Sequence, residues 1–285
     1  MRALITGAGG QVGSALLACV PRGVEAAGLT RDELDLEDET AIAATILEAR
    51  PDLLINAAAY TAVDKAESEP ELAQAINGDA VGAMARAMLE VGGRLVQVST
   101  DFVFDGEQST PYAPDDPRNP LSIYGQTKGA GEDAAGGDAI VCRTSWVYAA
   151  SGTNFVRTML RLMRERDELS VVADQIGAPT WATGLAQTLW ALALEGQPGI
   201  YHHRDAGVAS WYDFAVAIHE EARASELLSH DVDIHPIATE DYPTPAHRPA
   251  YSLLDDSETR ALLGDRPPHW RTNLRKMLQE EQPLG

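Results

Sequence analysis

Cysteine is scarce in this chain, and long apolar runs are missing. The two cysteines, Cys19 and Cys142, lie far apart in a sequence of 285 residues, with no Cys-x-x-Cys pair and no metal-ligand spacing. This pattern argues against a disulfide framework or a metal site and predicts free thiols in a reducing cytoplasm. No apolar stretch is long enough to span a bilayer, and the apolar run at 2–6 leaves no room for a signal peptide. We therefore expect a cytoplasmic protein without a membrane partner.

Positive charge is also in short supply. Lysine and arginine total 22 against 43 aspartates and glutamates, which gives a formal net charge of −21 and a pI of about 4.6. This balance argues against nucleic acid and anionic membranes as partners. Only three of the basic residues are lysines, namely Lys65, Lys128 and Lys276. A phosphate site must therefore rely on backbone dipoles and a few arginines.

What the chain does have is a regular alternation of short apolar runs and helical patterns. We expect strands at residues 2–6, 24–29, 53–55, 94–99 and 139–143, and helices at 14–19, 38–50, 67–91 and 122–133. Gly78 and Gly82 interrupt the long helix expected at 67–91. Repeated strand–helix units predict an α/β fold with a Rossmann-like, doubly wound parallel sheet. Beyond residue 150 the rhythm weakens, with expected helices at 154–166, 181–194 and 210–224 and strands at 169–173 and 200–203.

A glycine-rich turn follows the first strand. Gly7, Gly10 and Gly13 stand between the run at 2–6 and an apolar helix, with the spacing GxxGxxG rather than GxGxxG. In this context Gly7 allows a tight turn, Gly10 lets backbone N–H groups approach a pyrophosphate, and Gly13 permits close packing of helix and strand. The helix N-terminus adds partial positive charge for the phosphates. The turn predicts a dinucleotide site.

Tyr124 and Lys128 form a YxxxK motif on an expected helix. Residues four apart share a helix face, and an ammonium beside a phenol lowers its pKa from about 10. Such a tyrosine can exchange a proton with a carbonyl or an alcohol. The motif alone is weak, because many solvated helices carry it by chance.

Further candidate residues follow the ends of the other strands, where parallel sheets bind their ligands. Ala59, Tyr60 and Thr61 come after the third strand, Thr100 and Asp101 after the fourth, and Trp146 after the fifth. The Thr100 hydroxyl could bond a substrate carbonyl and share its proton with Tyr124, or it could merely satisfy strand-end backbone groups. This agreement of position is stronger than any single motif.

The chain resembles the extended short-chain dehydrogenases/reductases and, more narrowly, the dTDP-4-dehydrorhamnose reductases. The matching stretches, in family order, are GAGGQVG at 7–13, NAAAYTAVDKAESE at 56–69, VSTDFVFDG at 98–106, YGQTK at 124–128, RTSWVY at 143–148, QIGAPT at 175–180 and RPAYSLL at 248–254. They span nearly the whole sequence, which makes the resemblance specific.

The resemblance implies roles for individual residues. Tyr124 is the expected proton donor, Lys128 its pKa partner and ribose ligand, and Thr100 the hydroxyl that tunes the carbonyl. Asp101 and Trp146 are implied to contact a sugar nucleotide. The implied cofactor-lining residues are Gly10, Gln11, Val12, Asp35, Leu36, Ala59, Tyr60 and Thr61. The implied reaction is NAD(P)H-dependent reduction of the C4 carbonyl of dTDP-4-dehydro-6-deoxy-L-mannose to dTDP-L-rhamnose.

Two positions sharpen this reading. In the sugar-nucleotide 4,6-dehydratases that this fold resembles, the residues Thr-Asp-Glu follow the fourth strand. This chain has Phe102 at the third of these positions. A phenyl ring cannot act as an acid or base, so elimination is disfavoured. Some of these reductases carry a glutamate, linked to metal-assisted dimers, where this chain has Ala15. We therefore expect no metal site and a monomer or weak homodimer.

Cofactor choice depends on the residues after the second strand. Arg31 could meet the 2′-phosphate of NADPH, although it could also be a surface arginine paired with neighbouring acids. One of the acids Asp32, Glu33 or Asp35 could instead take the ribose hydroxyls. The balance favours NADPH, with NADH tolerated.

We expect two domains. Residues 1–150 form an NAD(P)-binding Rossmann domain, to which segments near 170–200 return, and residues 151–285 form mainly a substrate-binding domain. In the second, Arg248 could hold a diphosphate through two hydrogen bonds or serve as a structural ion-pair residue. His202 and His203 point to opposite faces of a strand and do not make a metal pair. Trp211 and Tyr212 fit a core better than a ligand site.

Alternatives to this reductase remain open. One is another sugar-nucleotide enzyme of the family, either a second kind of 4-ketoreductase or an epimerase that keeps its NAD bound. The other is a non-catalytic nucleotide-binding regulatory subunit, against which the intact set of Thr100, Tyr124 and Lys128 argues.

Overall fold

The computed structural model describes residues 1–264 and 266–280, and the last residues of the expected substrate domain, 281–285, lie outside the described residues. Its described part contains a six-stranded parallel sheet with the strand order β10-β5-β4-β3-β1-β2. The strands are β1 (Arg2–Thr6), β2 (Glu25–Leu29), β3 (Leu53–Asn56), β4 (Arg94–Thr100), β5 (Ile140–Thr144) and β10 (Gly199–His202). The predicted Rossmann-like doubly wound sheet is confirmed.

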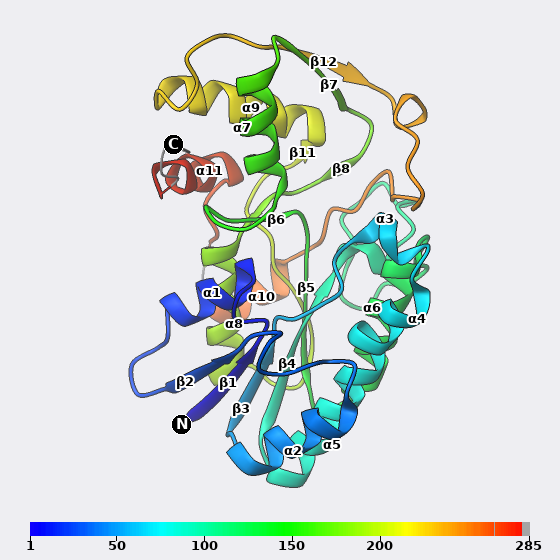
Figure 1. Cartoon of the computed structure of the whole chain (residues 1–285), viewed down its shortest axis with the longest axis vertical. Coiled ribbons are helices and arrows are strands. Elements are labelled where there is room, and N and C mark those ends of the chain that lie inside the picture. Colours follow the sequence, from blue (N-terminus) through cyan, green and yellow to red (C-terminus); the bar gives the residue numbers. More distant parts are fainter. Residues whose placement is uncertain (265, 281–285) are drawn as a thin grey trace.

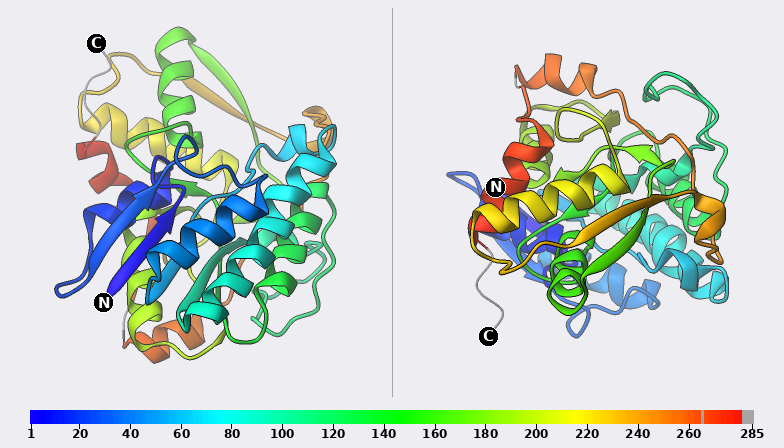
Figure 2. Two further views of the ribbon diagram at one scale, coloured as in Figure 1. Left: turned by 60° about the horizontal axis from the view of Figure 1, so that its bottom comes forward. Right: turned by 90° about the horizontal axis from the view of Figure 1, so that it is seen from above.

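Helices cover both faces of this sheet (Figures 1 and 2). One face carries α2 (Glu39–Ala49), α5 (Ala80–Val91) and α6 (Ile123–Ala135), while the other carries α1 (Gln11–Ala18) and α8 (Ala182–Glu195). Strand side chains alternate between the two faces. Leu4 and Leu54 therefore join the core under α2 and α5, whereas Ile5 and Ile55 join the core under α1 and α8. Burial on both faces explains why the strand sequences are almost continuously apolar.

A second lobe lies above the carboxyl ends of the strands (Figure 1). Its helices α7 (Phe155–Glu165), α9 (Trp211–Ala224) and α11 (Trp270–Glu280) share one apolar core, and a capping box of Ser210 and Asp213 starts α9. Three short strand pairs complete this part: β12 (Asp233–Ile237) with β7 (Glu168–Val172), β11 (Ala209–Ser210) with β8 (Ile176–Gly177), and β6 (Val147–Tyr148) with β9 (Thr180–Trp181). Helix α10 (Ser257–Leu263), which precedes α11 in the chain, packs beside β10 of the large sheet.

The helix expected at 67–91 differs from the prediction. A short helix, α3 (Val63–Ala66), comes first, and then α4 (Pro70–Gln74) leads through a π turn, η1 (Ala75–Asp79), into α5. Gly78 lies in this π turn, so the glycine that was expected to interrupt the helix marks a change of helical pitch instead. Such π turns cluster at functional sites. Two 3₁₀ turns, η2 (Asp101–Val103) and η3 (Thr239–Asp241), complete the described elements.

The stretch expected to return to the first domain is divided in the structure. Helix α8 and strand β10 lie in the sheet half, whereas β7 pairs with β12 in the upper lobe. No helix among residues 1–264 and 266–280 has the length and apolarity needed to cross a lipid bilayer.

Candidate active site

A cleft of about 1000 Å³ opens at the carboxyl ends of the central strands, below the second lobe. The chain passes from β1 outward to β2, then crosses back over β1 to β3 and continues in the opposite direction to β4 and β5. Open parallel sheets bind ligands at such a switch point. The cleft is lined by all the predicted site residues except Gly13: Gly7, Gly10, Gln11, Val12, Arg31, Asp35, Leu36, Ala59, Tyr60, Thr61, Thr100, Asp101, Tyr124, Lys128, Trp146 and Arg248.

The glycine turn is built for close backbone approach. Gly7 has a left-handed φ of 69°, and a Cβ there would lie 2.7 Å from the Ala58 amide nitrogen. Gly13 faces away from the cleft, where a Cβ would come within 2.1 Å of the Gly7 carbonyl oxygen. The N-terminus of α1 has Gly10 as its N-cap, with no side-chain cap. The first amides of this helix are therefore available to an anion.

The end of β2 presents a cation to the cleft rather than an acid. Arg31 is highly exposed, and its nearest carboxylate oxygen, on Glu37, is 3.9 Å away. Glu33 turns toward the backbone and side chain of Thr30, whose amide and hydroxyl both donate to it at 2.8 Å. These bonds hold the pKa of Glu33 below its usual range. Of the three candidate acids, Asp35 is the one that lines the cleft.

Tyr124 faces the cleft, but its pKa differs from the sequence-based expectation. Burial of the phenol, with a smaller contribution from the charge of Asp101, raises its pKa to about 12, and a hydrogen bond with Thr100 acts the other way. The expected lowering by Lys128 is wrong for this structure, because desolvation of the phenolate outweighs any nearby cation. A raised pKa keeps Tyr124 protonated at neutral pH, which is the form that a proton donor requires.

Lys128 is almost fully buried, and its Nζ donates to the Val98 carbonyl oxygen at 2.6 Å. Burial lowers its pKa to about 8, while the carboxylate of Glu132 acts in the opposite direction. The YxxxK spacing therefore brings both side chains to the cleft, as expected for one helix face.

Thr100 and Asp101 form a buried polar pair beside Tyr124. The Thr100 hydroxyl donates to Asp101 Oδ1 at 3.0 Å and also accepts from the Phe102 amide. Burial raises the pKa of Asp101 to about 6, although hydrogen bonds from Ser252 and Thr100 lower it. Phe102 packs edge-on against the Tyr124 ring at 5.5 Å between centroids. This wall of the cleft therefore holds a phenyl ring at the position that differs from the dehydratase pattern.

Trp146 is held in a strained conformation. Its φ is 48°, a left-handed value that bulky residues rarely adopt and that clusters at functional sites. Its indole stacks on Trp211, with 3.6 Å between the centroids and 10° between the planes. Trp211 also lines the cleft, so the expectation that it belongs only to the core is incomplete. The sequence offered no signal for this stack, because the two residues lie 65 positions apart.

Asn77 is a buried residue that the sequence reasoning missed. Its side-chain oxygen accepts from the Tyr60 amide at 2.9 Å, and its side-chain nitrogen donates to the Tyr60 carbonyl and to Thr127 Oγ1. It thereby ties the loop after β3 to the helix that carries Tyr124 and Lys128. Asn77 belongs to the π turn, and the adjacent Gly78 was the available signal.

Arg248 reaches the cleft already paired. Its two terminal nitrogens donate to the two carboxylate oxygens of Asp64 at 3.0 and 2.7 Å. This pairing lowers the pKa of Asp64 and links the segment at 241–256 to α3. The structure therefore shows the ion-pair role that was one of the two expectations for Arg248.

Comparison with known proteins assigns the chain to a family. The family model described as "RmlD substrate binding domain" matches residues 1–282. A dTDP-4-dehydrorhamnose reductase of Burkholderia thailandensis is 45% identical over 95% of this chain and 96% of its own length.

Two solved structures extend the comparison. A dTDP-4-dehydrorhamnose reductase of Clostridium acetobutylicum superposes with a TM-score of 0.93 at 38% identity, over 98% of this chain and 99% of that one. The dTDP-4-dehydrorhamnose reductase of Bacillus anthracis, solved in complex with NADP, gives a TM-score of 0.92 at 36% identity, with the same coverage. This chain therefore belongs to the dTDP-4-dehydrorhamnose reductase family.

Proposed function

We propose that this protein is an NADPH-dependent oxidoreductase. It reduces the C4 carbonyl of dTDP-4-dehydro-6-deoxy-L-mannose, also called dTDP-4-dehydro-β-L-rhamnose, to dTDP-L-rhamnose. The observation that carries the proposal is the convergence of Tyr124, Lys128 and Thr100 with the glycine turn in one cleft. The family relationship supplies the identity of the substrate and of the cofactor.

The residues of the cleft fit a dinucleotide. A pyrophosphate can approach the free amides at the start of α1, because Gly7 and Gly10 put no side chain in its way. The exposed guanidinium of Arg31 suits the 2′-phosphate of NADPH, while NADH, which lacks that group, can still be tolerated. When bound, the nicotinamide supplies the hydride, and the protein supplies position and polarity.

Proton delivery falls to Tyr124. Its raised pKa keeps the phenol protonated, and the hydrogen bond with Thr100 holds its hydroxyl group beside Thr100 at the cleft. In its ammonium form Lys128 places positive charge near the phenol, which stabilises the phenolate left after transfer. General acid catalysis of this kind contributes about 10²- to 10⁴-fold to a rate.

Substrate binding is assigned to residues on both sides of the cleft. We assign Thr100 and Asp101 to the sugar, Trp146 to the sugar nucleotide and Arg248 to the diphosphate. Trp211, stacked on Trp146, extends the aromatic wall and joins this set. The Rossmann domain at 1–150 then holds the cofactor, with α8 and β10 returning to it, and 151–285 supplies most of the substrate side.

Two wider features complete the proposal. We assign the protein to the cytoplasm, where a reductase that draws on NADPH has its cofactor and where Cys19 and Cys142 stay as free thiols. We also assign it a monomeric or weakly dimeric state, because Ala15 stands where some relatives have the glutamate of a metal-assisted dimer.

Substitution of Tyr124 by Phe tests the assignment of the proton donor. We expect Tyr124→Phe to lose about 10²- to 10⁴-fold in kcat, since it keeps the ring and removes the phenolic proton that Tyr124 is proposed to donate. NADPH affinity should stay unchanged. Turnover is followed at 340 nm with dTDP-4-dehydro-sugar epimers, with NADPH and NADH in parallel. The matched control is Tyr201→Phe, which removes a hydroxyl bonded to Gln197 outside the cleft. Full turnover by Tyr124→Phe would contradict the assignment.

A further inference from the structure

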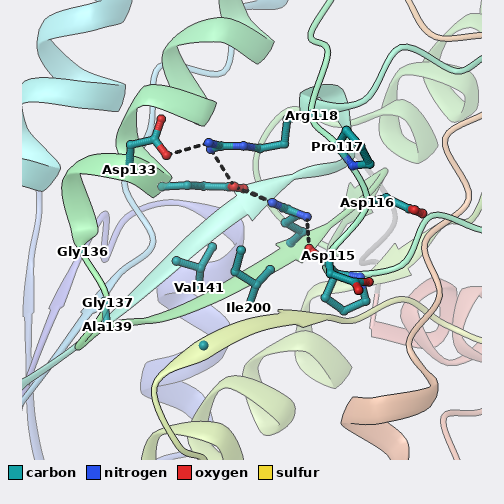
Figure 3. Close-up of a pocket in the computed structure, with 14 residues that line it drawn as sticks. Asp115, Asp116, Pro117, Arg118, Asp133, Gly136, Gly137, Ala139, Val141 and Ile200 are labelled. Atoms are coloured by element: carbon teal, nitrogen blue, oxygen red, sulfur yellow. Dashed lines mark hydrogen bonds and ion pairs between the residues drawn. The ribbon is translucent and has the colours of Figure 1, made fainter.

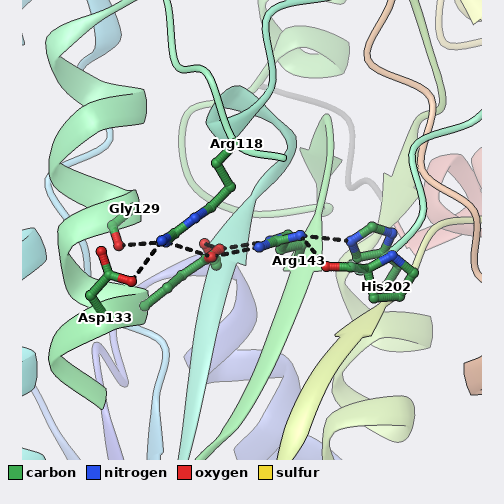
Figure 4. Close-up of polar contacts among 8 residues, drawn as sticks. Arg118, Gly129, Asp133, Arg143 and His202 are labelled. Atoms are coloured by element: carbon green, nitrogen blue, oxygen red, sulfur yellow. Dashed lines mark hydrogen bonds and ion pairs between the residues drawn. The ribbon is translucent and has the colours of Figure 1, made fainter. Parts of the chain in front are cut away.

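A buried carboxylate lies one helical turn beyond Lys128. Glu132 is 7% exposed, and its two oxygens accept four hydrogen bonds. Figure 4 shows two of the donors, Arg118 and Arg143, together with Asp133 and His202. Ser99 Oγ donates at 2.5 Å, Arg143 Nε and Nη2 donate at 2.8 and 2.7 Å, and Arg118 Nη1 donates at 3.2 Å. So many donors fix the orientation of the Glu132 side chain.

The partners of Glu132 connect it to the floor of the cleft. Ser99 directly precedes Thr100 at the end of β4, and Arg143 directly precedes Thr144 at the end of β5. Lys128 also bonds to β4, through the Val98 carbonyl oxygen. Glu132 therefore fastens α6, which carries Tyr124 and Lys128, to the strand from which Thr100 projects.

A second hollow of about 400 Å³ borders this network on the side away from the cleft. Figure 3 shows Arg118 and Asp133 on one side of it and Val141 and Ile200 on another. None of the residues that line it lines the main cleft. Arg118 donates to Glu132 at 3.2 Å and to Asp133 at 2.6 Å, and all three residues line this hollow.

Without Glu132, the buried guanidinium of Arg143 would have no carboxylate partner among the described residues. Arg143 is 1% exposed and finds Glu132 as its ion-pair partner among the described residues. His202 adds no charge, because burial and the neighbouring Arg143 lower its pKa to about 3. The charged or titratable side chains around Lys128 and Glu132 are Tyr124 and Asp133 on α6, Asp101 in η2, Arg143 on β5, His202 on β10 and Arg118 in the preceding loop. Glu132 is therefore the carboxylate that binds both arginines, and it lies one helical turn from Lys128 on α6.

We propose that Glu132 is a positioning residue, whose carboxylate fixes α6 on the ends of β4 and β5 and supplies a negative charge one helical turn from Lys128. The inference rests on the proposed function, because the charge of Lys128 aids catalysis through the phenolate that Tyr124 leaves after donating its proton. Burial alone pushes Lys128 toward the neutral amine, and Glu132 opposes that push. A neutral Lys128 could not stabilise the phenolate of Tyr124.

Titration of Lys128 by NMR tests this inference without requiring turnover. The chain has only three lysines, so ¹³Cε-lysine labelling gives three signals, and Lys128→Met identifies the one of interest. In the native chain we expect the midpoint of Lys128 to lie well below the ordinary range of a lysine, near pH 8. In Glu132→Gln its midpoint should fall by a further one pH unit or more, a tenfold or larger change in the amine–ammonium ratio.

Two more variants make the result decisive. Glu132→Gln leaves Arg143 buried without a partner and could unfold the chain. The double variant Glu132→Gln/Arg143→Gln removes both charges together, and its Lys128 midpoint should still lie below the native value. Asp133→Asn is the matched control, because it removes a neighbouring carboxylate of α6 that faces solvent and binds Arg118. A Lys128 midpoint that stays at the native value in the folded double variant would overturn the inference.

Reductase assays on the same samples separate this inference from the proposed function. The alkaline limb of kcat/KM should move to lower pH together with the NMR midpoint of Lys128, and Asp133→Asn should leave both in place. If the native chain reduces no dTDP-4-dehydro-sugar while the midpoint shifts as expected, the proposed function fails and the coupling of Glu132 to Lys128 stands. If the enzyme is active but the midpoint does not move, the inference fails alone.

Discussion

Arg248 and Asp64 form an ion pair with two parallel hydrogen bonds. Both terminal nitrogens of the guanidinium meet both carboxylate oxygens, at 3.0 and 2.7 Å. The pair is only partly buried, with 23% of the Arg248 side chain exposed. A diphosphate presents oxygens of similar geometry and greater charge. It can therefore compete with Asp64 for the same guanidinium.

Separate substitutions distinguish a ligand-binding Arg248 from a structural one. We expect Arg248→Ala to raise the KM for the dTDP-sugar about 10- to 100-fold, because hydrogen bonds to charged groups are worth about 1.5–3 kcal/mol. Asp64→Asn keeps the shape of the pair but weakens its hold on Arg248, so the KM should stay the same or fall. Steady-state kinetics at saturating NADPH measures both. An equal rise in KM for the two variants would show that Arg248 acts only through its ion pair.

At the residue scale, identity and position were predictable but electrostatics were not. The YxxxK motif and the residues after each strand led to the cleft, because spacing along helices and strands fixes which side chains share a face. Burial depends on atoms from distant segments. The pKa of Tyr124 at about 12 and the stack of Trp146 on Trp211 could therefore not be derived from local sequence.

Helix α6 lies unusually close to its neighbours, and its glycines make this possible. At Gly131 a Cβ would lie 2.0 Å from the Asn77 carbonyl oxygen in the π turn. At Gly125 it would lie 2.2 Å from the Phe102 carbonyl oxygen. Backbone contacts on two sides therefore set the position of Tyr124 and Lys128 between them.

A pair of glycine-to-alanine changes tests this close packing. Gly131→Ala should destabilise the fold by about 1–3 kcal/mol or more, because the methyl group meets backbone that cannot turn aside. At Gly129, on the same helix, the nearest atom to a Cβ is the flexible end of Arg118 at 3.7 Å. Gly129→Ala should therefore stabilise the helix by about 0.5–1 kcal/mol. Urea unfolding of the two variants measures the contrast, and equal stabilities would refute the packing argument.

At the element scale, the alternation of strands and helices gave most of the fold. Apolar spacing placed several elements within a residue or two, such as the helices expected at 154–166 and 210–224, which the structure shows as Phe155–Glu165 and Trp211–Ala224. The π turn at Ala75–Asp79 was not predictable, since its register depends on packing against α6 and on the bonds of Asn77 to Tyr60 and Thr127. Composition alone showed only that Gly78 weakened the helix.

At the scale of the whole molecule, a distant segment completes the sheet. Strand β10 joins the sheet edge beside β5, although more than 50 residues separate them. We expected segments near 170–200 to return to the Rossmann domain. The sequence could not show that β10 joins the large sheet and β7 does not, because both look like short apolar strands. The pairing places His202 beside Arg143 and so brings the edge of the sheet to the buried network.

This edge has a consequence for stability in acid. His202 is fully buried, its Nδ1–H donates to the Asp255 carbonyl at 3.1 Å, and its Nε2 accepts from Arg143 at 3.3 Å. Burial first and the charge of Arg143 second lower its pKa to about 3, against about 6.5 in an unfolded chain. Between these values the unfolded chain binds a proton that the folded chain does not. Stability therefore falls as the pH drops from about 6.5 toward 3.

His202→Gln isolates this contribution from the rest of the protein. We expect the variant to be less stable than the native chain at pH 7.5, and the gap to narrow by about 3 kcal/mol at pH 4.5, because the variant has no imidazole to protonate. Asp101 and Asp205, whose pKa values burial raises to about 6 and about 7, titrate in the opposite sense but are common to both proteins and cancel in the difference. Urea unfolding at the two pH values measures the gap, with His235→Gln, an exposed position on β12, as the control. If the difference in stability between the two proteins is the same at both pH values, protonation of His202 does not contribute to the loss of stability in acid.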